Sequence, residues 1–392
     1  MKTNSYIKSS IIVMTVFFLV FMISLLNSNL GGIVRVEAIS SSENFSNEDS
    51  FEVKDYTAII IPKSASGKSY MADRQDIITM PELKTQEEIN NFILSYEPLS
   101  SDLQRVRSLF EELGFNIIAQ DNLFLVVSGT SEEFHSIVPS LTTEQLESKD
   151  PNLNTFYHYQ LSSSNNINNI LDGVIIITEK NHLDDLTRSY FLQLSPEQIC
   201  SIDSYQASYS DVQRALKLDR VHAQGYTGKG VKIGFIDSGV YGSHPFFVNH
   251  PGNFHYFQIS HLIYEVSSNF DYSSDHGTAV ASYLVNSAPD AIFYSMALTS
   301  GWGTISKEAQ VLSYLAYINE THLIDILNLS QAFWEEIPGI DEYLAELRIE
   351  FLNFINQNGL LFIGGGNAHQ CSSGYPEYCS GHNAVAAIPE VI

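Results

Sequence analysis

Cysteine is scarce in this chain of 392 residues, which contains only three. Three cysteines exclude a small disulfide-stapled scaffold, because such folds need several bridges. Cys371 and Cys379 flank a short loop rich in Gly, Ser and Pro. They could close this loop as a disulfide in an oxidising compartment or remain two free thiols. Cys200 has no evident partner, so the pairing of the three stays open.

Basic residues are scarce as well. Lys and Arg number 20 against 45 Asp and Glu, which gives a formal net charge of -25. Such a surface repels phosphate groups, which argues against nucleic acid as a partner and against binding to anionic lipid surfaces. Apolar residues, at 44%, are frequent enough for packed cores, and the length fits two domains behind a leader.

The N-terminal segment has the pattern of a targeting sequence. Lys2 and Lys8 precede or flank an almost wholly apolar run over residues 11–26, and Ala38 offers the small residue of a cleavage site. We predict that residues 1–38 are a secretory signal peptide or, if uncleaved, a membrane anchor through residues 11–26. Either alternative places the following domains outside the cell, secreted or anchored to the membrane. A polar linker follows over residues 39–50.

The second half of the chain is organised around residues 231–239, VKIGFIDSG. A short apolar run closed by a turn signal is typical of a strand buried on both faces of a parallel sheet. Asp237 would end this strand, at the sheet edge where open α/β folds place their sites. On its own, this acid could equally cap a helix or make a turn.

Two further stretches favour a catalytic role. His276 lies in SDHGTAV (residues 274–280), before a helix-like run of small residues, and LLFIGGGN (residues 360–367) ends a second buried-strand pattern with Asn367. A carboxylate that orients an imidazole is two-thirds of a nucleophile-activating triad. An amide N–H donor beside it stabilises a developing oxyanion.

Strands and helices are expected to alternate after the His276 motif, which predicts a parallel sheet with right-handed crossovers. Strands are expected over residues 291–297, 324–329 and 360–363, and helices over residues 307–319 and 342–357. Between the Asp237 and His276 motifs the histidines are spaced unlike any compact zinc motif, so we expect no metal site there. They are His244, His250, His255 and His261.

These motifs resemble those of the subtilisin-like serine proteases, or subtilases. IDSGV with the following His-Pro-Phe is similar to the family's Asp block, DHGTAVAS to its His block and GGGN to its oxyanion block. The resemblance covers about residues 209–392. It implies a three-layer α/β/α fold with a mostly parallel sheet. It also implies hydrolysis of polypeptide substrates, with Asp237 as the orienting acid, His276 as the base and Asn367 as the oxyanion donor.

The resemblance also places Ser330, Gln331 and Ala332 at the strand that binds substrate backbone. The family usually has Leu-Gly-Gly after this Ser, whereas this chain has Gln-Ala-Phe, so the P1 preference stays open. Structural calcium is compatible with the family, but no ligands can be assigned. No other cofactor is expected.

The family's nucleophile block, Gly-Thr-Ser followed by Met or Ala, does not occur after Asn367. The only Gly-Thr-Ser lies far upstream at residues 129–131. We therefore expect these residues to be a C-terminally incomplete piece of a secreted serine endopeptidase. The alternative is a non-catalytic, truncated relative that binds peptides or a partner.

Residues 51–195 show a different, α+β pattern. Strands are expected over residues 56–61, 115–119, 123–128 and 174–178, and helices over residues 87–94, 102–113 and 132–138. The second and third strands are expected to pair across Gln120, Asp121 and Asn122.

Within this part, LQRVRSLFEELGFNI and LFLVVSGTSEEFHSI resemble the activation domain of the sedolisin (kumamolisin-type) proteases. The resemblance implies a small ferredoxin-like propeptide domain that acts as an intramolecular inhibitor and folding chaperone. An ordinary accessory domain is the alternative. Sedolisins normally lack the His block that surrounds His276, which leaves the subfamily open. Residues 196–208 are expected to be a linker in which maturation cleavage falls, and residues 209–392 a partial catalytic domain.

Overall fold

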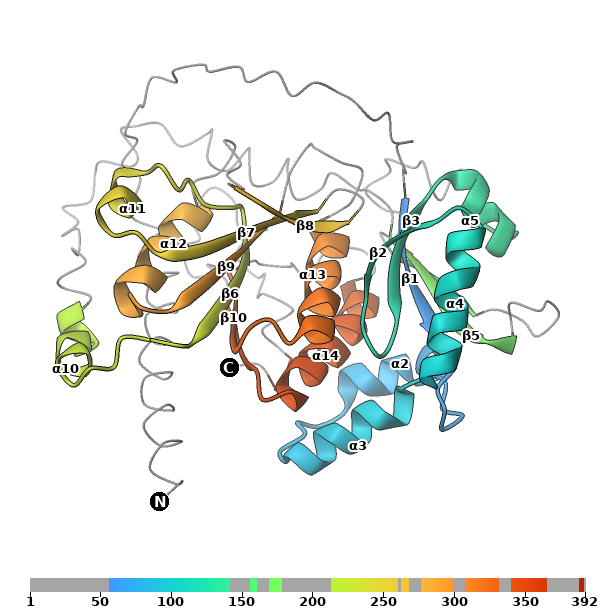
Figure 1. Cartoon of the computed structure of the whole chain (residues 1–392). Helices are drawn as coiled ribbons and strands as arrows, with labels where there is room; N and C mark the ends of the chain where they lie inside the picture. Colours follow the sequence, from blue (N-terminus) through green and yellow to red (C-terminus); the bar gives the residue numbers. More distant parts are fainter. Residues whose placement is uncertain are drawn as a thin grey trace, which may run out of the picture.

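The computed structural model describes residues 56–141, 156–160, 169–177, 213–259, 262–267, 276–298, 307–330, 340–364 and 388–390. Two β-sheets lie on either side of a central pair of helices, α13 (Lys307–Thr321) and α14 (Ile340–Asn356) (Figure 1). We call the described residues up to 177 the first unit and those from 213 onward the second unit. The expected signal or anchor, both linkers, Cys200, Cys371 and Cys379 lie outside the described residues.

The first unit is built on a five-stranded sheet in the order β2-β3-β1-β5-β4, and each pairing within it is antiparallel. Alternate residues of β1 enter two different cores, because successive side chains of a strand point to opposite faces. Ala58 and Ile60 face α4 and α5, whereas Ile59 and Ile61 face the helices of the other side. The strands are β1 (Tyr56–Pro62), β2 (Asn116–Gln120), β3 (Leu125–Gly129), β4 (Phe156–Gln160) and β5 (Leu171–Ile177).

The helices of the first unit begin at residues that the sequence marks as caps. Thr85 and Glu88 form a capping box at the start of α3, and Thr130 and Glu133 form another at α5. The four helices of this unit are α2 (Tyr70–Thr79), α3 (Gln86–Tyr96), α4 (Ser100–Glu112) and α5 (Ser131–Ile137). The last three lie within a few residues of the helices expected from the sequence, whereas α2 was not expected.

The second unit is built on a six-stranded sheet in the order β11-β10-β6-β9-β7-β8. The described pairings are parallel from β11 to β7, and β8 pairs antiparallel with β7. The expected strands are present, whereas the β7–β8 hairpin was not expected. The strands are β6 (Lys232–Asp237), β7 (Asn253–Ile259), β8 (Ile263–Val266), β9 (Ile292–Ala297), β10 (Ile326–Leu329) and β11 (Leu360–Ile363).

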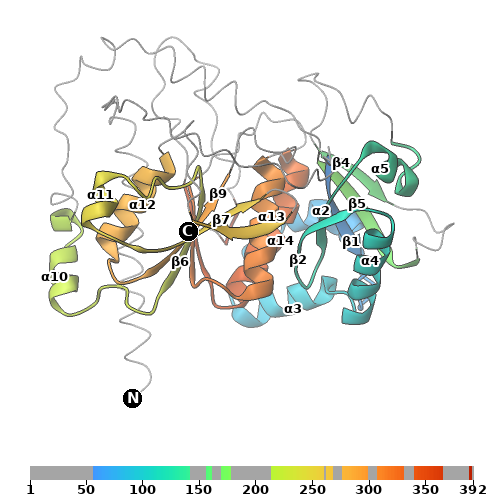
Figure 2. The ribbon, with the colours of Figure 1, turned by 45° about the horizontal axis from the view of Figure 1, so that its top comes forward.

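Helices cover both faces of this second sheet (Figure 2). On one face, α12 (His276–Ser287) packs its Val280 and Leu284 against Phe235 and Phe293. On the other face lie α13 and α14, against the side chains of Leu327 and other strand residues. The result is a three-layer α/β/α arrangement. Two short helices complete the unit, α10 (Leu218–Ala223) and α11 (Pro245–Asn249).

One hydrophobic cluster runs through both units. It contains Ile59 and Ile175 of the first sheet, Leu327 and Leu361 of the second sheet, and residues of α13 and α14 between them. These two helices therefore bury apolar side chains against both sheets. Among the described residues, no helix is long and apolar enough to cross a membrane, and residues 11–26 lie outside that part of the chain.

A buried arginine also joins the units. Arg348 of α14 is 1% exposed, and its Nη1 donates to the carbonyl oxygens of Ile77 and Met80, at 2.7 and 2.8 Å, where α2 ends. Its Nη2 lies 2.6 Å from Oε1 of Glu390. The guanidinium thus satisfies carbonyls that the end of a helix leaves unpaired, while the carboxylate balances its charge.

Candidate active site

Asp237 lies at the carboxyl end of β6, inside the parallel part of the second sheet. β6 lies between β9 and β10, with Asp237 beside Ala297 in the parallel register. The Asp237 side chain is fully buried, and its Oδ1 accepts the backbone N–H of Ser238 at 2.7 Å. A buried carboxylate is costly unless donors or a cation compensate it, so this position needs further partners.

His276 provides that partner from the first residue of α12. Its Nδ1 lies 2.8 Å from Oδ1 and 3.0 Å from Oδ2 of Asp237. The His276 side chain is 43% exposed, whereas the carboxylate is 0% exposed. The pair therefore extends from the interior of the sheet to a solvent-accessible imidazole.

A close approach between α12 and the turn after β6 positions the pair. The backbone N–H of Gly277 donates to Ser238 Oγ at 3.0 Å. A Cβ at Gly277 would lie 2.3 Å from the Gly239 carbonyl oxygen and 3.1 Å from Asp237 Oδ1, so only glycine fits. Gly239 has φ +88°, a left-handed conformation that favours glycine. The glycines after Asp237 and His276 thus let the two elements meet.

Sequence reasoning missed two hydroxyl groups that hold this junction. Ser238 Oγ accepts from the start of α12, as described, and Thr278 Oγ1 accepts the backbone N–H of Tyr241 at 2.9 Å. Each hydroxyl directly follows, or lies two residues after, a member of the acid–base pair. That position is the only signal in the sequence, and it does not distinguish them from the serine and threonine residues that are common beside any turn.

The geometry defines the chemistry that the imidazole can perform. With its Nδ1–H donated to Asp237, the neutral ring carries its lone pair on Nε2. Nε2 can then accept a proton, and the adjacent carboxylate stabilises the imidazolium that forms. The spatial contact that the motifs predicted between Asp237 and His276 is therefore present, while their catalytic roles stay predictions.

Of the expected substrate-binding residues, the structure describes Ser330, which directly follows β10. Its Oγ accepts from Nδ2 of Asn328 at 2.9 Å. β10 is the neighbour of β6, so Ser330 lies at the same sheet edge as Asp237. Gln331, Ala332 and Asn367 lie outside the described residues.

The described histidines between the two motifs have local roles. His244 Nδ1 accepts the backbone N–H of Phe246 and so caps α11, and His255 Nδ1 lies 2.7 Å from Oε1 of Glu265. Within the described ranges, no group of three or more His, Cys, Asp or Glu residues is arranged to hold a metal ion. His261 lies outside these ranges.

Three solved structures are similar to parts of this chain. One is the prenylagaramide maturation protease PagA, with 16% identity, a TM-score of 0.32, and coverage of 45% of this chain and 56% of that chain. A second is the epidermin leader peptide processing serine protease EpiP from Staphylococcus aureus, with 11% identity, a TM-score of 0.38, and coverage of 84% and 66%. A third is fervidolysin from Fervidobacterium pennivorans, a keratinolytic enzyme related to subtilisin, with 8% identity, a TM-score of 0.32, and coverage of 82% and 41%.

The chain spans 41% to 66% of the length of these three solved structures. A search among curated proteins finds no match. The model of the subtilase family (Peptidase_S8) matches residues 228–389, a segment that includes the end of β6, the start of α12 and the second sheet. Over residues 228–389, therefore, the chain is similar to the subtilase family, and this segment holds both Asp237 and His276.

Proposed function

We propose that this protein is a subtilisin-like serine endopeptidase in which Asp237 and His276 are the acid and base of an Asp/His/Ser triad. The observation that carries the proposal is the 2.8 Å contact between His276 Nδ1 and Asp237 Oδ1. It lies at a strand end and a helix start within the segment that matches the subtilase family. A fully buried acid against a partly exposed imidazole is the arrangement that a nucleophilic hydroxyl needs from its base.

In this mechanism, a serine hydroxyl attacks the carbonyl carbon of a peptide bond while His276 Nε2 takes the hydroxyl proton. Asp237 stabilises the resulting imidazolium, which then gives the proton to the leaving amine. Water hydrolyses the acyl-enzyme by the same route in reverse. The serine is not assigned among the 392 residues, because no Gly-Thr-Ser block follows Asn367.

Two further roles belong to the proposal. The Asn367 side-chain amide would donate to the oxyanion of the tetrahedral intermediate, a contact worth about 3–4 kcal/mol in comparable sites. Ser330, with Gln331 and Ala332, would line the groove that binds the backbone of a polypeptide substrate. Support for Ser330 comes from its position at the end of β10, beside the strand that carries Asp237.

The first unit would act as a propeptide of the sedolisin type, as inhibitor and folding template. Its strand order β2-β3-β1-β5 is that of a ferredoxin-like sheet, to which β4 adds an edge strand. It packs on α13 and α14, elements of the proposed catalytic unit, through a shared hydrophobic cluster. Residues 1–38 would direct secretion or anchor the protein to the membrane.

The test is labelling with a fluorophosphonate probe, which reacts only with an activated serine. The protein expressed from its complete reading frame should label, and mass spectrometry of the labelled peptide should identify the nucleophile. His276→Ala should reduce the labelling rate by a factor on the order of 10⁴ or more, because the serine loses its base. His255→Ala is the matched control, since His255 contacts Glu265 and lies outside the acid–base pair.

Labelling that survives His276→Ala would contradict the assigned base. No labelling of the unsubstituted protein, together with retained binding of peptides, would instead support the non-catalytic, peptide-binding alternative. The two variants must first be shown to have the same circular dichroism spectrum, so that a loss of labelling reports on chemistry.

A further inference from the structure

Arg348 of α14 lies where three parts of the chain meet: α14 itself, the end of α2 and the short segment 388–390. Its Nε donates to Oε2 of Glu390 at 2.9 Å, and its Nη2 donates to Oε1 at 2.6 Å. Both side chains are buried, at 1% and 3% exposed. A bidentate pair of this kind fixes the guanidinium and the carboxylate in one relative orientation. We call Arg348 and Glu390 the backbone clamp, because their other described hydrogen bonds go to main-chain atoms of the first unit.

The backbone clamp contacts five main-chain groups within residues 77–83. Four carbonyl oxygens accept from Nη1 or Nη2 of Arg348, while Oε1 of Glu390 accepts the backbone N–H of Leu83 at 3.0 Å. Two of these carbonyl groups belong to the last turn of α2, which leaves its carbonyl groups without helical partners. The carbonyl groups are those of Ile77, Ile78, Met80 and Pro81, at 2.7, 3.2, 2.8 and 3.1 Å. The clamp therefore fits a helix C-terminus that continues as extended chain, as α2 does at Met80, and recognises it through the backbone.

Each partner of Arg348 depends on the other. Every described acceptor of Nη1 belongs to the first unit, so this nitrogen loses its acceptors when residues 77–83 leave. Without Glu390, the guanidinium would lie buried without the carboxylate that balances its charge, which is strongly unfavourable. The first unit also helps to exclude water from the ion pair, which strengthens the attraction between the two charges. Binding of one partner therefore increases the affinity of α14 for the other, and the effect is reciprocal.

Apolar packing links the same parts of the chain. Ile388 is 6% exposed and belongs to the hydrophobic cluster that also contains Ile77. Met80 and Leu83 are partly buried and pack against this cluster. Residues 388–390 thus share with the end of α2 both the backbone clamp and an apolar environment.

We propose that the backbone clamp binds the first unit and residues 388–390 to α14 cooperatively, so that loss of one loosens the other. The partner that the clamp selects is the first unit, through residues 77–83. The meaning for the enzyme rests on the proposed function: residues 388 and 389 end the segment that matches the subtilase family, so a propeptide would hold part of the catalytic unit in place. Departure of the first unit would then loosen residues 388–390 from α14.

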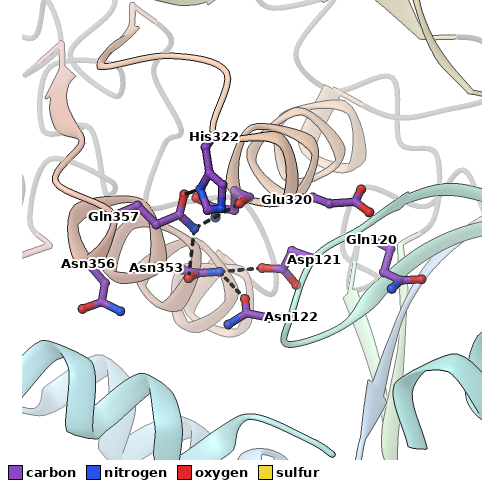
Figure 3. Close-up of a pocket in the computed structure, with 9 residues that line it drawn as sticks. Gln120, Asp121, Asn122, Glu320, His322, Asn353, Asn356 and Gln357 are labelled. Carbon is purple, nitrogen blue, oxygen red and sulfur yellow. Dashed lines mark hydrogen bonds between the residues drawn. The ribbon is translucent and has the colours of Figure 1, made fainter. Parts of the chain in front are cut away.

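Other contacts between the units do not involve the clamp. Beside a polar cavity between the β2–β3 turn and α14, Asn353 Nδ2 donates to Asp121 Oδ2 at 2.7 Å and to Asn122 Oδ1 at 2.8 Å (Figure 3). None of the described hydrogen bonds joins these three residues to Arg348 or Glu390. A substitution at Asn122 therefore weakens the contact between the units without a change in the clamp. It distinguishes cooperative from independent binding.

Two rates measured on the full chain test the proposal. Hydrogen–deuterium exchange of residues 77–83 reports opening at the end of α2. Reaction of a thiol reagent with Ile388→Cys reports opening of residues 388–390, because this side chain is buried, and mass spectrometry separates it from the three natural cysteines. Glu390→Gln keeps the size of the side chain and an oxygen acceptor but removes the charge. Both rates should therefore rise about tenfold or more.

Asn122→Ala tests the coupling from a distance. It removes an acceptor for Asn353 and should raise both rates by the same factor, about two- to tenfold. Thr130→Ala is the matched control, since it removes the cap of α5. The hydrophobic cluster of α5 contains no described residue of the second unit, so neither rate should change.

A rise at residues 77–83 without a rise at position 388, in either variant, would overturn the proposal. A thiol at position 388 that reacts as fast as a free thiol in the otherwise unchanged chain would overturn it too. If Asn122→Ala changes neither rate, Glu390→Gln decides, because it must change both.

Neither rate depends on catalysis, so this test and the fluorophosphonate test can fail separately. Fluorophosphonate labelling with uncoupled rates would refute the clamp and leave the proposed protease. Coupled rates without labelling would keep the clamp and make the first unit an accessory domain.

Discussion

Gly277→Ala tests whether the junction between β6 and α12 positions the acid–base pair. The added Cβ would lie 2.3 Å from the Gly239 carbonyl oxygen, whereas ordinary contact begins at 3.4 Å. The obstacle is backbone, and Gly239 is held in a left-handed conformation, so side-chain rotation cannot relieve the overlap. To restore ordinary van der Waals contact with this oxygen, the start of α12 must move away from Gly239 by about 1 Å.

A shift of this size would break the pair. The contact between His276 Nδ1 and Asp237 Oδ1 would lengthen from 2.8 Å to beyond hydrogen-bonding distance. We expect a loss of about 1–3 kcal/mol in the free energy of unfolding from the overlap. Fluorophosphonate labelling should slow by about 100-fold, since a displacement near 1 Å has that effect on positioned groups.

The assay is the downfield proton resonance of the His276 Nδ1–H, which exists only while that proton is held by Asp237. Gly277→Ala should remove the resonance. Ala279→Gly, in the same helix, should cost about 1 kcal/mol in stability but keep the resonance, because it adds no atom. A Gly277→Ala protein with the wild-type resonance and labelling rate would refute the reasoning.

Three substitutions test contacts that hold the fold. Arg348→Met should lower the free energy of unfolding by about 3–5 kcal/mol, measured by urea denaturation, because it leaves Glu390 buried without its partner. Thr85→Ala should cost about 1 kcal/mol by the same measurement, since α3 loses its capping box with Glu88. Tyr314→Phe should cost about 1–3 kcal/mol, visible as a lower thermal midpoint, because its buried hydroxyl bonds to two carbonyl groups. An unchanged midpoint in any of them would contradict the role given to that contact.

The acid–base pair could be located from the sequence because each member carries a local signal. Asp237 ends an apolar run, and His276 precedes a run of small residues, and both patterns act over a few residues. Their meeting is a long-range event, but a parallel sheet brings strand ends and the following helix starts to one edge. The hydroxyl contacts of Ser238 and Thr278 could not be predicted, because serine and threonine are common beside any turn.

Helices and strands could be predicted where the local pattern of apolar and polar residues was clear. They could not be predicted where contacts with distant residues determine the structure. The helix α2 buries only Tyr70 and Ile77, so its sequence shows no apolar stripe, and Arg348 from far along the chain satisfies its last carbonyls. The β7–β8 hairpin interrupts a segment rich in histidine and aromatic residues, where the alternation of apolar and polar residues is imperfect.

The burial of α14 could not be predicted from its own residues. The sequence indicated a helix, but Glu346, Glu350 and Asn353 would ordinarily mark a face in contact with water. In the structure all three are at most 2% exposed, and two of them have partners in the first unit: Glu346 bonds to Tyr70, and Asn353 bonds to Asp121. Only the tertiary contact shows that this polar face is covered by another part of the same chain.

The way in which Arg348 holds α2 has a consequence for sequence drift. The guanidinium binds main-chain oxygens of Ile77, Ile78 and Met80, which every residue type supplies. The hydrogen bonds to Arg348 therefore do not depend on which side chains stand at these positions, although Ile77 is also constrained by its burial in the hydrophobic cluster. What natural selection must preserve here is the residue at which α2 ends. Pro81 helps to fix this end, because proline has no backbone N–H to donate within a helix and disfavours helical geometry in the residue before it.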